Sequence, residues 1–249
     1  MENLILKIKY SADKTRQLRE EIKNLFLMKI NIDEASLKAE ELPDSALFII
    51  FELYDKIFFQ DQIIELYSKT GFDKLNFRFS RRMSGSAGIT VIPKLVTIDK
   101  CIEIAISRNH MHCFELSGRD KEVGGILVNT AFDALLLVFE HELCHLIEYM
   151  LFGKTNCKQK TFKVLAYNYF GHIKSTHLLP AHKEINLNKY DFRPGDKVKF
   201  IYQEKNYKGI ISKINKQATV MCLDSKGIYI GTDKKRYSKF YVPMDMLNK

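Results

Sequence analysis

Between residues 135 and 148, an apolar segment with helical periodicity carries two histidines and two glutamates at its centre. The apolar positions are Leu135, Leu136, Val138, Phe139, Leu143, Leu146 and Ile147. A helix with so many apolar positions is expected to be buried, so other elements must pack around it. Thr130, followed by Asp133, predicts the N-terminal cap of this helix, and Gly153 predicts its end. The charged residues inside it need partners, because burying an unpaired polar group is costly.

The spacing of the two histidines points to a metal ion as that partner. His141 and His145 are one helical turn apart and share a face, so both imidazoles can reach one Zn²⁺. Glu142 projects beside them and could take a proton from water at the metal. This is the H-E-x-x-H signature of zincins. The alternative is a pair of core histidines satisfied by hydrogen bonds, with the glutamates at the surface.

A catalytic zinc usually has three protein ligands, and the sequence leaves the third open. Cys157 follows a glycine turn and could fold back over the motif helix, although an ordinary buried thiol is equally compatible. His172 is the alternative ligand if the chain reverses at the glycine before it. His177 and His182 are weaker candidates. Glu148 is an orienting residue, a ligand or a plain surface glutamate.

The rest of the chain predicts an α+β protein with a zincin-like metalloprotease domain and a small C-terminal SH3-like β-barrel. The expected parts are an N-terminal helical extension (1–43), the metallopeptidase domain (44–189) and the barrel (190–249). The expected elements are helices over 12–30, 46–70 and 159–170, strands over 75–80, 89–92 and 101–107, a loop over 109–125, and short strands after residue 196. The motif Arg193–Pro194–Gly195–Asp196 predicts the boundary before the barrel.

Positive charge is concentrated at the end of the chain. Residues 190–249 hold 13 Lys and Arg against 6 Asp and Glu, in a chain whose formal net charge is +9. A nucleic acid is one partner that this charge fits, and a solubilising surface is the other interpretation. Within this part, Lys234, Lys235 and Arg236 could contact phosphates beside aromatic residues, or could form an exposed hairpin tip.

Cysteine usage and hydropathy bear on the compartment. The 5 cysteines are widely spaced and odd in number, which favours a reducing environment over a disulfide framework. No apolar run approaches the ~20 residues that span a bilayer, and no secretory signal is recognisable. We therefore expect a cytoplasmic protein that is neither secreted nor bound to a membrane.

The motif and its flanks resemble the SprT-like metallopeptidases over residues 46–179. The resemblance is carried by F-E-H-E-L-C-H-L-I-E, by the later T-F-K-V-L-A-Y-N-Y-F-G-H, and by the strand and turn from Leu75 to Gly88. It implies a zinc-dependent protease that trims proteins bound or crosslinked to DNA, and hence a role in DNA repair. Where that family has its third histidine ligand, this chain has Lys158, and Cys157 is the nearest usable ligand. The family's C-terminal zinc ribbon is missing, and the basic barrel stands in its place.

The predicted function is therefore that of a zinc metalloendopeptidase acting on protein or peptide substrates. Glu142 is the predicted catalytic base. The strand over 101–107, which precedes the motif helix, is expected at the rim of the site, paired with an extended substrate. The alternative function is a non-catalytic, zinc-stabilised module that binds nucleic acid or protein. A cysteine ligand favours that alternative, because thiolates are common in structural zinc sites.

Overall fold

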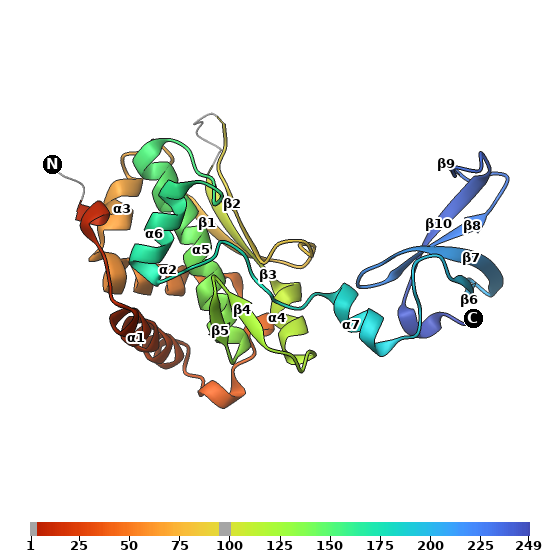
Figure 1. Ribbon diagram of the computed structural model, residues 1–249, viewed down its shortest axis with the longest axis horizontal. Helices are drawn as coiled ribbons and strands as arrows, with labels where there is room; N and C mark the ends of the chain where they lie inside the picture. The colour runs from red at the N-terminus through yellow and green to blue at the C-terminus, as the bar shows by residue number, and fades with distance from the viewer. Residues whose placement is uncertain (1–3, 95–100) are drawn as a thin grey trace. The chain divides into compact units, whose positions relative to one another are not determined.

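A computed structural model describes residues 4–94 and 101–249 of the chain (Figure 1). The fold is mixed α+β and divides into two compact units, Met1–Leu179 (unit 1) and Pro180–Lys249 (unit 2). The boundary lies ten residues before the one expected from the sequence, because helix α7 belongs to unit 2. Among the described residues, no helix combines the length and the apolar character required to cross a bilayer.

Unit 1 consists of helices packed around two small sheets. Its helices are α1 (Ala12–Ile30), α2 (Asp44–Phe59), α3 (Gln62–Tyr67), α4 (Arg108–Glu115), α5 (Ala131–Phe152) and α6 (Lys160–Phe170), with 3-10 turns at Leu4–Lys7, Glu34–Ser36 and Ala39–Glu41. Its strands are β1 (Leu75–Ser80), β2 (Gly88–Val91), β3 (Ile102–Ser107), β4 (Lys121–Val123) and β5 (Ile126–Val128). Helix α5 lies between α6 and the β1–β3–β2 sheet, at the centre of the apolar core (Figure 1).

The prediction of one helix over 46–70 is wrong, because the chain breaks between α2 and α3. Gln60 and Asp61 both have positive φ angles, of 53° and 64°. The buried carboxylate of Asp55 accepts hydrogen bonds from the backbone N–H groups of Ile63 (2.7 Å) and Ile64 (3.1 Å). These bonds satisfy donors that the start of α3 leaves free and so stabilise the break.

The larger sheet of unit 1 has the strand order β1–β3–β2, with β3 parallel to β1 and antiparallel to β2. Strand β3 is therefore central, and both of its edges are paired. The expectation that this strand pairs with a substrate is wrong, because β1 and β2 are the edge strands of this sheet. The predicted loop over 109–125 is also wrong, since it contains α4 and β4, and His110 is buried in α4.

A buried ion pair ties α1 to the motif helix. Glu140 is fully buried, and its carboxylate accepts hydrogen bonds from Arg19 (2.6 and 2.8 Å) and from the Tyr54 hydroxyl (2.8 Å). His172 Nε2 lies 2.8 Å from the same carboxylate. Burial by itself raises the pKa of Glu140, but the pairing with Arg19 and His172 outweighs it and lowers that pKa. The N-terminal helix is thus part of the core of unit 1.

Unit 2 is a five-stranded antiparallel sheet. It contains α7 (His182–Lys189), β6 (Lys197–Tyr202), β7 (Lys205–Ile214), β8 (Ala218–Leu223), β9 (Tyr229–Ile230), β10 (Arg236–Val242) and a 3-10 turn at Met244–Met246. The strand order is β6–β7–β8–β10–β9. Strand β9 pairs only with β10, and the outer edge of β6 makes only an isolated bridge, Lys199 to Asn248. The described strands therefore form an open sheet and not the closed barrel that was expected.

Candidate metal centre

The two motif histidines lie on one face of α5, as their spacing requires. The Thr130 side chain caps the helix by accepting from the Asp133 N–H (3.0 Å), and Gly153 ends it with a φ of 69°. Between these caps, the rings of His141 and His145 lie 5.0 Å apart, centroid to centroid. The helical context predicted from the apolar periodicity is confirmed, and it directs both imidazoles to one site.

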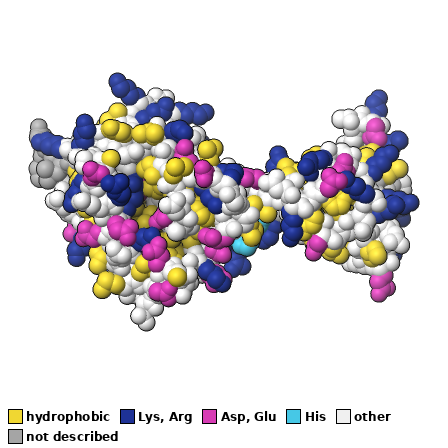
Figure 2. Space-filling model, turned by 60° about the horizontal axis from the view of Figure 1, so that its bottom comes forward, with side chains coloured by type: hydrophobic (Ala, Val, Ile, Leu, Met, Phe, Trp, Pro, Cys, Tyr) yellow, Lys and Arg dark blue, Asp and Glu magenta, His cyan; other side chains and the backbone are white. Residues whose placement is uncertain are grey.

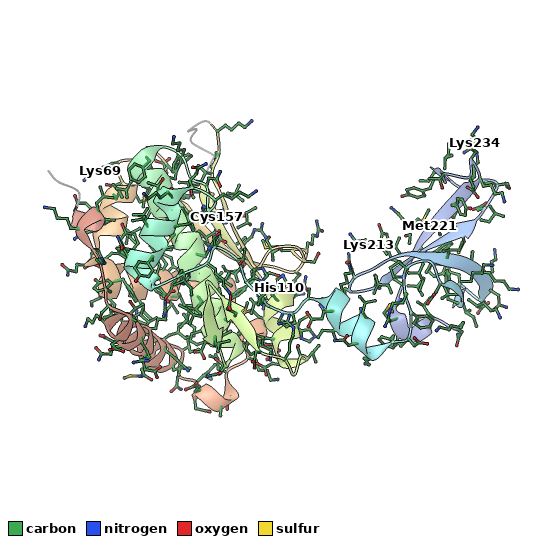
Figure 3. All side chains as sticks on the ribbon, viewed as in Figure 1. Lys69, His110, Cys157, Lys213, Met221 and Lys234 are labelled. Carbon is green, nitrogen blue, oxygen red and sulfur yellow. The ribbon has the colours of Figure 1, made fainter. Side chains whose placement is uncertain are left out.

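Cys157 is brought to the same site by the connection between α5 and α6 (Figure 3). One nitrogen from each of His141 and His145 and the Cys157 sulfur all lie within 4.8 Å of one another. Closing these distances by about 1 Å would give the spacing of ligands around a tetrahedral ion. Two imidazoles and a thiol form a donor set that suits zinc.

A chain of hydrogen bonds orients His145 and holds the loop that carries the cysteine. Thr155 Oγ1 donates its proton to Glu148 (2.7 Å), and so it can only accept from His145 Nδ1, which lies 2.6 Å away. The His145 proton is then on Nδ1, and Nε2 is left with a free lone pair for a metal ion. Glu148 is buried and also accepts from the Asn156 N–H (2.9 Å), next to Cys157. Of the roles considered from the sequence, Glu148 therefore has the orienting one.

The environment keeps both imidazoles neutral. The ring of Phe162 lies 4.9 Å from the His141 ring and 4.4 Å from the His145 ring, centroid to centroid. Burial lowers the pKa of His141 to about 3, and burial also lowers the pKa of His145. Metal ligands must be deprotonated, so a pair of rings that resists protonation is already in the binding form.

Glu142 is buried against strand β2. The Thr90 hydroxyl lies 2.8 Å from Glu142 Oε2 and 3.0 Å from the Glu142 carbonyl oxygen. Thr90 therefore contacts both the carboxylate and the backbone of Glu142. Burial raises the pKa of Glu142 to about 7, against the smaller opposing effect of Thr90. Gly88 passes so close that a Cβ there would lie 2.6 Å from Glu142 Oε1. A side chain at this position would therefore displace the Glu142 carboxylate or strand β2.

These groups line a cleft of about 420 Å³. The lining includes residues 86–90, Val123, Gly124 and residues 175–177, together with His141, Glu142, His145 and Cys157. His177 lines the cleft but is not in the donor cluster. Its Nδ1 accepts from the Leu179 N–H (3.2 Å), so its proton is on Nε2. Burial lowers the pKa of His177 to about 4.

The other candidates from the sequence lie elsewhere. His172 is bonded to Glu140 and lies outside the donor cluster. Lys158 is exposed, and His182 begins α7 in unit 2. In unit 2, Lys234 is at the tip of the hairpin between β9 and β10, away from Met221 in the sheet (Figure 3).

Sequence reasoning missed two residues of the centre, Thr90 and Thr155. Thr90 lies on strand β2, 52 residues before its partner Glu142, and Thr155 lies in the loop after α5. Neither residue therefore has a fixed spacing from the motif. For Thr155, a signal was available, because it lies seven residues after Glu148 in the short connection that also holds Cys157. No family model, curated protein or solved structure matches the chain.

Proposed function

We propose that unit 1 is a zinc-dependent endopeptidase, with His141, His145 and Cys157 as zinc ligands and Glu142 as the general base. The proposal rests on one observation, namely that a buried glutamate borders an open cleft beside three clustered metal donors. The resemblance to SprT-like metallopeptidases agrees with it. The proposal includes a zincin-like fold for unit 1 and an SH3-like, incompletely closed sheet for unit 2.

When bound, zinc would polarise the scissile carbonyl and make water more acidic. The side chain of Glu142 accepts the proton of the attacking water and delivers it to the leaving amine. Its raised pKa, about 7, suits both transfers near neutral pH. Thr90 and Gly88 keep the carboxylate against β2, so its position does not depend on the substrate.

The free edge of β2 provides a place for an extended peptide. Gly88, Ile89 and Thr90 line the cleft, and Ile89 and Val91 each expose 43% of their surface. An extended substrate can add to such an edge through backbone hydrogen bonds, with little demand on its sequence. The substrate class we propose is protein, including protein bound to DNA, which the positive charge of unit 2 favours.

The test is Glu142→Gln, which keeps the size of the side chain and removes the base. Purified wild type, this variant and Glu21→Gln, a matched change on the exposed face of α1, are compared. Zinc content and hydrolysis of fluorescent casein are measured for each. We expect all three to bind zinc equally and only Glu142→Gln to lose hydrolysis. Equal hydrolysis by the two variants would exclude Glu142 as the base.

The second candidate function is a non-catalytic, zinc-stabilised binding module. One observation favours it, because a cysteine ligand is more typical of structural zinc sites than of catalytic ones. X-ray absorption of the zinc-loaded protein separates the two functions. A coordination shell of two nitrogens, one sulfur and one water oxygen is expected of the peptidase. A shell completed by a fourth protein ligand would favour the module.

A further inference from the structure

The five strands of unit 2 contain no acidic residue. They include seven Lys and Arg (Lys197, Lys199, Lys205, Lys208, Lys213, Arg236 and Lys239), while the Asp and Glu of unit 2 lie in α7, the turns and the C-terminal 3-10 helix. A sheet whose strands carry charge of a single sign repels cations and attracts a polyanion. Figure 2 shows Lys and Arg side chains interspersed with hydrophobic ones on this unit.

The pairing register decides which of these side chains share a face. Val198, Ile211, Val220, Cys222 and Val242 are buried in the core of unit 2. The alternate positions point to the other face. One row across four strands is Lys197, Ile210, Met221 and Lys239. On the same face, Lys199 of β6 pairs with Lys208 of β7, and Tyr237 of β10 pairs with Leu223 of β8 and with Tyr229 of β9. A second row crosses β7, β8 and β10 through Lys213, Thr219 and Tyr241. We call these twelve residues the outer face.

The outer face is open and hollowed. Ile210, Leu223 and Tyr241 expose 42%, 65% and 63% of their surface. A groove of about 590 Å³ lies on it, lined by Lys197, Lys199, Lys208, Met221, Tyr237 and other residues. Within the described part of the chain, none of the five lysines of the outer face forms a salt bridge. No carboxylate of the described chain therefore neutralises their charge.

Neighbouring side chains orient the tyrosines of the outer face, of which Tyr229 exposes 36% and Tyr241 63% of its surface. Asp233 accepts a hydrogen bond from the Tyr237 hydroxyl (2.7 Å). The Lys239 ammonium lies 4.3 Å from the Tyr229 ring centroid and 5.4 Å from that of Tyr241. Lysines interleaved with tyrosines on an open sheet satisfy both needs of a single nucleic-acid strand, which are neutralised phosphates and a surface for base stacking. A duplex hides its base faces and could use only the lysines.

We propose that the outer face binds single-stranded DNA, with its lysines on the phosphates and Tyr229, Tyr237 and Tyr241 stacked on bases. Single-stranded DNA and RNA both present phosphates and base faces, so DNA is the strand that we assign and oligo(U) is the comparison that tests RNA. The hairpin tip at Lys234 is outside this surface. The proposal does not depend on zinc or on peptidase activity, and it supplies a specific partner for the proposed function.

The experiment measures fluorescence anisotropy of a labelled 20-nucleotide oligo(dT) with the full-length protein over a range of salt concentrations. The triple variant Lys197→Gln, Lys199→Gln and Lys208→Gln should bind more weakly, with the slope of log affinity against log salt reduced by roughly 2, about 0.7 per lysine. The matched control is Lys216→Gln, Lys226→Gln and Lys234→Gln, which removes the same charge from turns. It should change the slope little.

Stacking is tested with Tyr241→Leu and Tyr237→Leu, which keep an apolar side chain and remove the ring. Each should lower the affinity for oligo(dT) by about 5- to 150-fold, whereas Tyr241→Phe and Tyr237→Phe should retain it. Tyr167→Leu, at an exposed position of unit 1, should change nothing. Circular dichroism checks that each variant is folded.

Several outcomes would overturn the proposal. One is the absence of oligo(dT) binding at low salt by the folded wild type. Equal binding of oligo(dT), duplex DNA and heparin would reduce the outer face to a general polyanion surface, and tighter binding of oligo(U) or of anionic lipid vesicles would assign another partner. A loss of affinity in the turn-lysine control comparable to that of the triple variant would move the site to the turns. Casein hydrolysis, measured in parallel, reports on the zinc centre separately.

Discussion

Replacing Gly88 by alanine should disable the site without changing any proposed ligand or the base. The added Cβ would lie 2.6 Å from Glu142 Oε1 and 2.7 Å from Glu142 Cγ. Favourable contacts between such atoms begin near ~3.5 Å, so either the glutamate or the strand must move by about 1 Å. The φ angle of Gly88 is not positive, so the effect is steric and not one of backbone conformation.

That displacement sets the expected loss of stability and the expected loss of catalytic rate. Overpacking at a filled site costs about 1–3 kcal/mol of unfolding free energy. A catalytic group misplaced by about 1 Å costs roughly 100-fold in rate. We therefore expect Gly88→Ala to lower both the unfolding free energy and kcat/KM on a fluorescent peptide. Zinc content should stay unchanged, because the donors are not displaced.

Gly85→Ala is the matched control, since nothing lies within 4 Å of a Cβ at that position. Its stability should be unchanged or slightly higher, because alanine restricts the unfolded chain. Urea denaturation of chelated protein, followed by circular dichroism, measures the unfolding free energy. Peptide hydrolysis measures kcat/KM. If Gly88→Ala stays within about 0.5 kcal/mol of Gly85→Ala and hydrolyses peptide equally well, the close approach of β2 to Glu142 is refuted.

Three further predictions concern the ligands, the core and pH. Cys157→Ser should weaken zinc binding by more than about 100-fold in a chelator competition, whereas Cys157→His should retain zinc; a Ser variant with wild-type affinity would remove Cys157 from the ligand set. Arg19→Met leaves Glu140 buried without its main counter-charge and should cost about 3–5 kcal/mol in urea denaturation, and a loss below about 1 kcal/mol would contradict this. Burial lowers the pKa values of His141 and His177 from 6.5 to about 3 and about 4, so the unfolded state binds more protons at acid pH. Glu142, whose pKa is raised from 4.5 to about 7, acts in the opposite direction between pH 7 and 4.5 and offsets one ring. Chelated protein should thus show a net loss of stability as pH falls from 6.5 towards 4, of up to about 1.4 kcal/mol per pH unit while Glu142 titrates, and a flat profile in denaturation experiments would refute it.

Local patterns in the sequence were enough to place the motif helix. The apolar period, the Thr130 cap and Gly153 all act within a few residues of one another, and the structure has a helix between them. The alternating pattern after Leu75 likewise gave β1. The break at Gln60 was missed, because the buried Asp55 carboxylate that stabilises it carries no local signal of its contacts.

The residues around the motif were harder to assign. Sequence spacing left Cys157 and His172 as alternatives, since both follow glycine turns near the helix. In the structure, the Glu148–Thr155 hydrogen bond fixes the loop that carries Cys157, and Glu140 takes up His172. The expectation that the strand over 101–107 pairs with a substrate was wrong, because strand order is a long-range property that periodicity does not encode.

The sequence by itself determined that two imidazoles and a carboxylate share one helix, and that positive charge gathers in the last sixty residues. Both follow from chemistry that acts along the chain, namely helical geometry and composition. The tertiary structure alone decided which third donor joins them, which threonine and glycine hold Glu142, and which face of unit 2 collects the lysines and tyrosines. Those outcomes depend on packing and strand register, which bring together residues that have no fixed separation in sequence.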